Sequence, residues 1–370
     1  MYNNIKEFLN NKTWDDALIH ELYLKYIKFR ELKEDSEIFN NLVLLFNKKT
    51  DTEIQKECNG LILDKQTKNV VVSCQHDFES NKPEDNENFI SAEYCEDGTV
   101  IRLYNYKGMW YTATNKCING QYSYWSNTKT FHDMFWETFS HPKLDLSKLN
   151  PECTYLFTLL HKDNILVVKH FTNSLIYLGN INNVTNEMNN ANDFELFSIN
   201  PNIRLSEKIT LNEDDLQDLD SVCNKYFNTT KRGIILKYTN NRIYKHDFKQ
   251  FTFIQNIRGN EPFIRNRYLE LLTDPQSLYI LLVHYPEHKF TFSMVHHNLL
   301  VVSNEIYALY KRTHVKHSFT IKEDHLYYRT LKQLHAQYKN TQKPITKQDV
   351  YNKLCSYNVF LLRKLLKWVN

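Results

Sequence analysis

The sequence predicts an α+β protein in which antiparallel β-sheets with flanking helices are followed by an all-α C-terminal domain. Short apolar and β-branched runs between residues 57 and 248 are separated by polar turns, as in strands joined by short connections. From Phe292 to Leu309, apolar residues recur in alternating steps of three and four, the spacing of an amphipathic helix. A chain of 370 residues is long enough for two domains. We place them at residues 1–260 and 261–370.

The composition excludes several kinds of site. The seven glycines include no Gly-x-Gly pair, which excludes the phosphate-binding loops of Rossmann and P-loop proteins. A nucleotide site would therefore depend on side chains. The seven cysteines are dispersed without a Cys-x-x-Cys pair, so we expect reduced thiols in a cytoplasmic protein and no zinc ribbon. A polar N-terminus predicts no signal peptide, and the lack of long apolar runs predicts no membrane partner.

Charge is distributed unevenly along the chain. Residues 261–370 contain 16 Lys/Arg against 8 Asp/Glu, a net charge of +8, whereas the first 260 residues carry a net charge of −5. A basic C-terminal third is compatible with binding a polyanion such as RNA. It is equally compatible with lysine-rich helix faces that are simply solvated, and the sequence leaves both interpretations open.

The N-terminal part is predicted to be helical over residues 4–32, because Ile5, Leu9, Leu18 and Leu22 approximate an apolar stripe. The apolar segment at 42–46 is assigned to irregular structure that joins this helix to a sheet. A strand that ends at Asp64 is then expected to pair with residues 69–73.

The segment 91–116 is the one around which the other elements are arranged. We predict strands at 90–94, 99–104 and 110–114, with the first two joined as a hairpin, because Asp-Gly between apolar runs is a strong hairpin signal. An aromatic-rich helix over 125–139 is expected to pack on the sheet. Two further strand pairs are predicted, at 154–160 with 165–170 and at 231–238 with 242–248.

The frame Cys95-Glu96-Asp97-Gly98-Thr99 resembles the nucleotidyl-transfer motif of the ATP-dependent RNA ligases, in particular the phage type. In that family a nucleophilic lysine stands two residues before Asp-Gly. Cys95 occupies this position here. The resemblance implies a ligase-type nucleotidyltransferase fold for residues 1–260, and pieces of the C-terminal part look like the helical module found in some of these ligases.

Other segments resemble the family's remaining motifs in the same order along the chain. Asn59 stands where the family has an arginine before Gly60 and its strand, and Thr158 stands where a strand glutamate belongs. Arg232 replaces the glutamate that precedes a glycine and an apolar strand. On the partner strand, Ile243 replaces the first of two lysines and Lys245 retains the second.

These replacements remove the groups that the family's chemistry requires. The family's lysine attacks the α-phosphorus of ATP while carboxylates hold ribose and Mg²⁺, and such catalysis depends on positioning and charge. An arginine in place of a carboxylate would repel the metal, since two unit charges about 4 Å apart interact by roughly 4 kcal/mol at an effective dielectric near 20. We therefore expect Cys95, Thr158, Arg232 and Ile243 to be degenerate catalytic positions, with no metal site. A thiolate nucleophile at Cys95 is disfavoured as well, because its supporting groups are absent.

The resemblance therefore implies an inactive ligase relative that binds RNA, or a nucleotide- or cap-like RNA end, within a larger complex and with no cofactor. Asp97, Lys116, Arg232 and Lys245 are the predicted binding residues. One alternative is an active RNA ligase that uses a displaced lysine, and only this alternative requires ATP and Mg²⁺. Another is a protein-interaction scaffold that binds no nucleic acid. The Asn- and Lys-rich composition resembles proteins of large DNA viruses, which implies the host cytoplasm.

Overall fold

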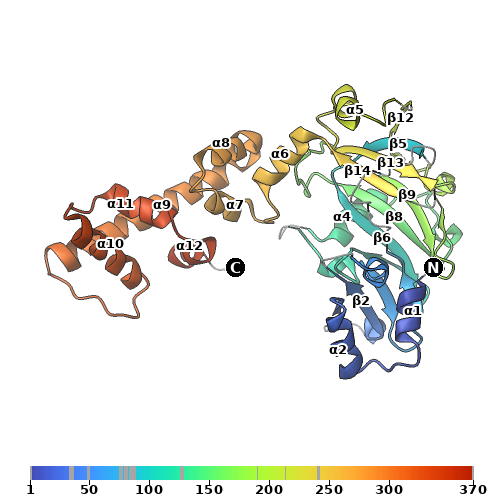
Figure 1. Ribbon diagram of the computed structural model, residues 1–370, viewed down its shortest axis with the longest axis horizontal. Coiled ribbons are helices and arrows are strands. Elements are labelled where there is room, and N and C mark those ends of the chain that lie inside the picture. The colour runs from blue at the N-terminus through green and yellow to red at the C-terminus, as the bar shows by residue number, and fades with distance from the viewer. Residues whose placement is uncertain are drawn as a thin grey trace. The chain divides into compact units, whose positions relative to one another are not determined.

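The computed structural model describes residues 2–32, 37–47, 51–74, 78, 82, 89–125, 129–189, 191–212, 214–239 and 242–368. The chain divides into two compact units, residues 1–252 and 253–370. The division falls within helix α6 (Lys249–Arg258), a few residues before the boundary placed from the sequence. The first unit contains three β-sheets and the second is helical (Figure 1). The predicted fold class, antiparallel sheets with helices followed by C-terminal helices, is confirmed.

The first sheet is built around an apolar strand that the sequence analysis assigned wrongly to irregular structure. This strand, β2 (Leu42–Phe46), pairs with β1 and β3 and is buried on both faces. Val43 and Leu45 pack against helices α1 and α2, while Leu42 and Leu44 pack against residues of the second sheet. Burial on both faces removes the alternation that identifies a half-buried strand. The sheet order is β1 (Lys28–Arg30), β2, β3 (Leu61–Asp64) and β4 (Val70–Val72).

The predicted helix over residues 4–32 is also wrong in its extent. Two short helices, α1 (Asn3–Leu9) and α2 (Asp16–Leu24), are followed by β1. Asp15 caps α2 through its side chain, and Tyr26 adopts a left-handed backbone conformation (φ 59°) at the turn into β1. A short helix, α3 (Glu53–Glu57), precedes β3, and the pairing of β3 with β4 is as predicted.

The second sheet is covered on one face by an aromatic helix, as expected. Helix α4 (Phe131–Phe139) places Phe131, Phe135 and Phe139 on strands β6 and β8, and the ring centroids of Phe135 and Phe157 lie 5.5 Å apart. Of the predicted helix 125–139, residues 126–128 lie outside the described part. Strand β11 pairs with β9 in parallel, while the other pairings are antiparallel. The path is β10 (Met188–Asn189), β9 (Ser174–Asn182), β8 (Cys153–Leu160), β6 (Thr99–Tyr106) and β7 (Met109–Ala113), with β11 (Ile203–Arg204) beside β9.

The third sheet shows that the predicted hairpin is wrong. Strand β5 (Phe89–Cys95) does not pair with β6, because it belongs to a separate antiparallel sheet, and residues 96–98 carry the chain from one sheet to the other. A Cβ atom on Gly98 would lie 2.5 Å from the carbonyl oxygen of Leu159. The glycine is therefore needed for the close approach of this crossover to β8. The sheet order is β12 (Lys208–Ile209), β5, β13 (Gly233–Tyr238) and β14 (Ile243–Asp247), with α5 (Leu219–Lys225) before β13.

Residues 165–170 are not the partner strand of β8, which pairs instead with β9. The backbone N–H groups of Val167 and Val168 both donate to the buried Asp97 carboxylate, at 2.9 Å each. His170 donates through Nε2 to the carbonyl oxygen of Asp97, 2.7 Å away. Asp97 thus organises this loop, and the apolar residues that suggested a strand are used for a turn around a carboxylate.

A buried cation joins the first and second sheets. The Arg102 side chain on β6 is fully buried and donates to the carbonyl oxygens of Gly60, Ser73 and Thr114, from three separate segments. Burial lowers the pKa of its guanidinium to about 10, and neighbouring thiol and phenol groups oppose this effect. These three hydrogen-bond partners are backbone carbonyls, so the Arg102 side chain links three backbone segments within the core.

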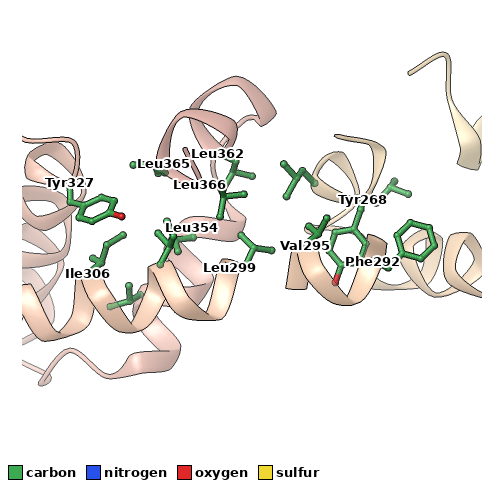
Figure 2. Packing of buried hydrophobic residues seen from close by; sticks show 14 of the residues in the cluster. Tyr268, Phe292, Val295, Leu299, Ile306, Tyr327, Leu354, Leu362, Leu365 and Leu366 are labelled. Carbon is green, nitrogen blue, oxygen red and sulfur yellow. The ribbon is translucent and has the colours of Figure 1, made fainter. Parts of the chain in front are cut away.

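The helical unit is held together by the apolar stripe predicted from the sequence. Phe292, Val295, Leu299 and Ile306 of α9 are buried, and Figure 2 shows Tyr268 beside Phe292 and Tyr327 facing Ile306. Thr346 and Asp349 form a capping box at the start of α11. The helices are α7 (Ile264–Glu270), α8 (Pro275–His284), α9 (Lys289–Tyr310), α10 (Tyr328–Thr341), α11 (Lys347–Cys355) and α12 (Val359–Leu365), and a π-helical turn, η8 (Lys311–Val315), extends α9.

Several single-turn 3₁₀ segments connect these elements: η1 (Glu37–Phe39), η3 (Gly120–Tyr122), η4 (Leu146–Lys148), η5 (Phe194–Leu196) and η7 (Pro286–His288). Among the described residues, no helix is both long enough and apolar enough to cross a membrane.

Candidate functional site

A cavity of about 120 Å³ lies between the second and third sheets. Its lining includes all four positions singled out as degenerate, namely Cys95, Thr158, Arg232 and Ile243, together with Lys245. These residues come from β5, β8, the segment before β13, and β14. Residues separated by up to 150 positions in the sequence are therefore gathered around one hollow, as the ligase resemblance requires. Their binding role stays a prediction.

Strand register explains how the cavity's basic end is built. In the third sheet Gly233 lies opposite both Cys95 and Asp247, and Ile235 lies opposite Lys245. A Cβ atom on Gly233 would lie 2.2 Å from the carbonyl oxygen of His246, so only glycine fits at this point. The N–H of Arg232 donates to the carbonyl oxygen of Cys95 at 2.8 Å. These constraints hold Arg232 and Cys95 next to each other at the end of the sheet.

Arg232 is paired with the carboxylate of Asp247 on the neighbouring strand. Its Nε and Nη2 atoms donate to the two oxygens of Asp247, each at 2.8 Å, and Asp97 is occupied by backbone N–H groups instead. This is the bidentate geometry favoured by guanidinium and carboxylate groups. Burial lowers the pKa of Arg232, but the hydrogen bonds and charge of Asp247 outweigh it, so the pKa is raised overall.

Lys245 shares the same carboxylate at longer range. Its Nζ lies 3.9 Å from Asp247 Oδ1, beyond hydrogen-bond distance, and 4.9 Å from the centroid of the Phe78 ring. Burial, together with the positive charge of Arg232, lowers the pKa of the Lys245 ammonium. The Arg232 and Lys245 cations therefore lie beside the Asp247 carboxylate, and the charge of the buried Asp97 also acts on both of them.

Cys95 is a neutral thiol at ordinary pH. The side chain is only 7% exposed, and burial raises its pKa from 9.0 to about 12, although Arg232 and Lys245 act in the opposite direction. A thiolate is the reactive form of cysteine, and such a high pKa leaves almost none of it near pH 7. The thiol therefore fills space beside the two cations.

The acidic residues around the cavity already have partners. Glu93 accepts from Lys237 at 2.9 Å, and Glu96 accepts from Lys231 at 2.6 Å and from Arg204 at 3.1 Å. Among the described residues, no three His, Cys, Asp or Glu side chains are grouped so as to hold a metal ion. The carboxylates of the site thus serve as counterions for basic side chains.

Lys116 does not line this cavity, contrary to expectation. Its side chain is exposed, and its carbonyl oxygen accepts a hydrogen bond from Arg30 of β1 at 2.6 Å. The cause is a sharp turn after β7, in which Thr114 and Cys117 bridge back to each other while Arg102 holds the carbonyl of Thr114. The chain is thereby directed toward the first sheet.

Sequence reasoning missed Glu93 and Lys237, an ion pair that lines two adjoining cavities. Glu93 and Lys237 also line an adjoining cavity of about 350 Å³, which includes Tyr177, Tyr238 and Lys208. Lys237 lies between apolar residues of β13, and a lysine inside an apolar strand was the available signal for a polar cleft. Together the fold and the cavities define an α+β protein with a partly basic cleft between two β-sheets.

No family model matches the chain. An immediate-early protein ICP-46 homolog of Invertebrate iridescent virus 3 is 22% identical over 209 residues, which cover 54% of this chain and 44% of that protein. The chain thus spans less than half the length of this curated viral relative.

Among solved structures, the chain is similar to two forms of an archaeal ATP-dependent RNA ligase. The TM-scores are 0.47 and 0.48, with 10% identity and coverage of 78% of this chain and 73% of that chain in both cases. An RNA ligase mutant of Naegleria gruberi has a TM-score of 0.35 and 8% identity, with coverage of 66% of this chain and 84% of that one.

Proposed function

We propose that the protein binds RNA, or a nucleotide-like RNA end, without transferring a phosphoryl group, and that it does so within a larger complex in the cytoplasm of a virus-infected host. The observation that carries this proposal is the composition of the cavity. Arg232 and Lys245 share a single carboxylate beside a neutral thiol. Such a site suits a phosphate group and lacks a nucleophile at Cys95.

Charge favours an anion at this end of the cavity. In the described part of the chain, the Lys245 ammonium has no hydrogen bond, and its pKa is lowered by burial and by Arg232. A phosphate oxygen near Lys245 would supply the missing acceptor and oppose both effects. Hydrogen bonds to charged groups contribute about 1.5–3 kcal/mol. A terminal phosphate is therefore a suitable ligand. The positive charge of the helical unit is compatible with binding of a longer RNA.

The size of the cavity argues for a terminal group over a whole buried nucleotide. Its volume of about 120 Å³ is well below the roughly 300–1,000 Å³ of typical small-molecule sites. The adjoining cavity of about 350 Å³ lies beyond the Glu93–Lys237 ion pair. A ligand that occupied both cavities would have to displace or straddle this pair. We therefore assign the phosphate to the Arg232–Lys245 end and the attached nucleoside to the larger cavity.

Retention of short RNAs with a 5′-phosphate or a 5′-hydroxyl end, measured as salt rises from about 50 to 200 mM, tests the proposal. We expect salt-dependent binding, tighter for the phosphorylated RNA. Lys245→Ala should remove this preference and lower the affinity for phosphorylated RNA roughly tenfold, as expected for the loss of one charged hydrogen bond. Lys116→Ala, an exposed lysine outside the cavity, is the matched control and should behave as wild type. No salt-dependent retention would favour the protein-interaction scaffold.

An active ligase with a displaced lysine is the second candidate, and one observation favours it. The lowered pKa of Lys245 increases the fraction of nucleophilic amine. Incubation with α-labelled ATP and Mg²⁺, followed by a denaturing gel, separates the two candidates. A labelled band that Lys245→Ala abolishes would establish adenylation and overturn the non-catalytic proposal.

A further inference from the structure

The junction between α9 and α10 carries a concentration of positive charge that the cavity does not explain. Helix α9 continues into the π-helical turn Lys311–Val315, a rare conformation that is frequent at functional sites. Lys311, Arg312, Lys316 and His317 are exposed on or just after this turn, and no acidic residue interrupts them. In the described structure none of these side chains forms an ion pair.

Four aromatic rings cross from this turn to α10. The ring of Tyr310 stacks on His314 with centroids 5.1 Å apart and an interplanar angle of 11°, and His314 lies 4.4 Å from His335. His335 in turn stacks on Tyr338 at 5.9 Å. The turn thus places two histidines side by side at the surface. We call His314, His317, His335 and Lys339 the histidine cluster.

The hydrogen bonds at the turn determine which nitrogen of His314 is available. The Thr313 hydroxyl donates to the carbonyl oxygen of Leu309 at 2.9 Å, so its oxygen must accept from Nδ1 of His314, 2.7 Å away. Nδ1 therefore carries the proton, and Nε2 is the nitrogen that titrates. Nδ1 of His335 is buried and has no hydrogen-bond partner in the described structure.

In the part of the chain that the structure describes, the charged groups that act on the two rings are positive. The pKa of His314 is lowered by burial and then by His335, His317 and Lys339, and the pKa of His335 is lowered by burial, Lys339 and His317. Nearby on the chain, the Glu323 carboxylate is engaged by the hydroxyl of Tyr328 at 3.1 Å. A cationic surface without a carboxylate partner is relieved when an anion binds.

Exposed rings lie beside these cations. Phe319 is 42% exposed with the Arg312 guanidinium 4.9 Å from its centroid, and Tyr338 is 37% exposed. Stacking rings interleaved with basic side chains are the usual platform for single-stranded nucleic acid, where each stacked base contributes about 1–3 kcal/mol. A merely solvated lysine face would need neither the rings nor their contact with Arg312.

We propose that the histidine cluster, with Arg312 and Lys316, binds the backbone of single-stranded RNA in a pH-dependent manner while Phe319 and Tyr338 stack on its bases. This inference rests on the proposed RNA binding and assigns it a second surface, in the helical unit. A phosphate beside the cluster raises the pKa values of His314 and His335 from their lowered free-state values. Binding therefore takes up protons, and affinity increases as pH falls through the histidine range.

Fluorescence anisotropy of the full chain with a short 5′-hydroxyl oligouridylate tests the inference, because uracil does not titrate between about pH 6 and pH 8 and the end carries no phosphate. We expect wild-type affinity to rise as pH falls from about 8 to about 6, by at most about tenfold for each pKa unit gained on binding. His314→Gln with His335→Gln should reduce this dependence strongly, whereas the exposed His297→Gln should leave it intact. Arg312→Gln with Lys339→Gln should reduce the salt slope by about 1.4, from roughly 0.7 per lost contact.

The outcomes are distinguishable. If both double variants bind like wild type, with the same pH and salt dependence, the RNA surface lies elsewhere and the inference is overturned while the proposed function stands. If the wild-type chain itself shows no salt-dependent binding of any RNA, the proposed function fails as well. Arg312 and Lys339 are exposed, so their variant should fold even if the histidine variant does not, and it then decides the matter alone.

Discussion

Replacing Asp247 by asparagine should change the stability of the fold and its affinity for anions in opposite directions, because the Arg232–Asp247 ion pair affects both. The side chains of Arg232 and Asp247 are only 23% and 19% exposed, and two charge-assisted hydrogen bonds join them. Asp247→Asn leaves a mostly buried guanidinium with a weaker acceptor, so we expect a loss of about 2 kcal/mol. In a unit of this size that loss corresponds to a fall in Tm of about 4–8 °C.

The same substitution should strengthen anion binding. It removes one negative charge near Lys245, and a unit charge at about 6 Å contributes roughly 1.4 kcal/mol at an effective dielectric near 40. Phosphorylated RNA should therefore bind about tenfold more tightly to a protein that melts earlier. Thermal melting by circular dichroism and RNA retention at low salt measure the two effects. A variant that loses both stability and affinity would refute the assignment of Asp247 as a counterion that competes with phosphate.

Three further predictions concern the core around the site. Cys95→Ala should leave RNA binding unchanged. Because the thiol pKa rises from 9.0 to about 12 on folding, the thiol's contribution to the free energy of unfolding is present below pH 9 and is lost as pH rises toward 12. Alkaline unfolding should therefore be less pH-dependent in the variant. Arg102→Ala should lower the free energy of unfolding by at least about 3 kcal/mol, by removing donors from three buried carbonyls, as urea titration would show. Gly98→Ala should lower the free energy of unfolding by about 1–3 kcal/mol, because the new methyl would lie 2.5 Å from the Leu159 carbonyl oxygen. An unchanged urea midpoint in the Arg102 or the Gly98 variant would contradict the contacts of that residue.

Strand positions could be predicted where one face is buried and the turn is local. The pairs β3–β4 and β13–β14 are joined by short polar turns, and both form as expected. The segment from β5 to β6 could not be predicted in the same way. Asp97-Gly98 has the residues of a hairpin turn, but the glycine is used for contact with β8 and the aspartate for the loop at Val167. Both contacts join residues more than 60 positions apart, which local patterns do not encode.

The position of the site residues could likewise be predicted only where it follows from strand pairing. The order of the motif-like segments predicted that Cys95, Thr158, Arg232, Ile243 and Lys245 would meet, and they line one cavity. Each lies within or directly before a regular strand, so its direction follows from strand pairing. Lys116 lies after a strand, at a turn whose direction is set by Arg30 and Arg102, and its position could not be inferred. The partner of Arg232 was missed because Asp247 becomes its neighbour only through the β13–β14 register.

The pairing of Arg232 also explains how a basic residue is tolerated at this position. An unpaired guanidinium beside Cys95 and Lys245 would be a buried charge next to a like charge, which destabilises a fold by several kcal/mol. Asp247 offsets that penalty and fixes the direction of Arg232 through two hydrogen bonds. Its distance to Lys245 is longer, 3.9 Å, and the pKa of the Lys245 ammonium is still lowered, first by burial and then by Arg232. The cleft therefore contains a half-buried lysine whose charged form is disfavoured, a condition that a bound phosphate would relieve.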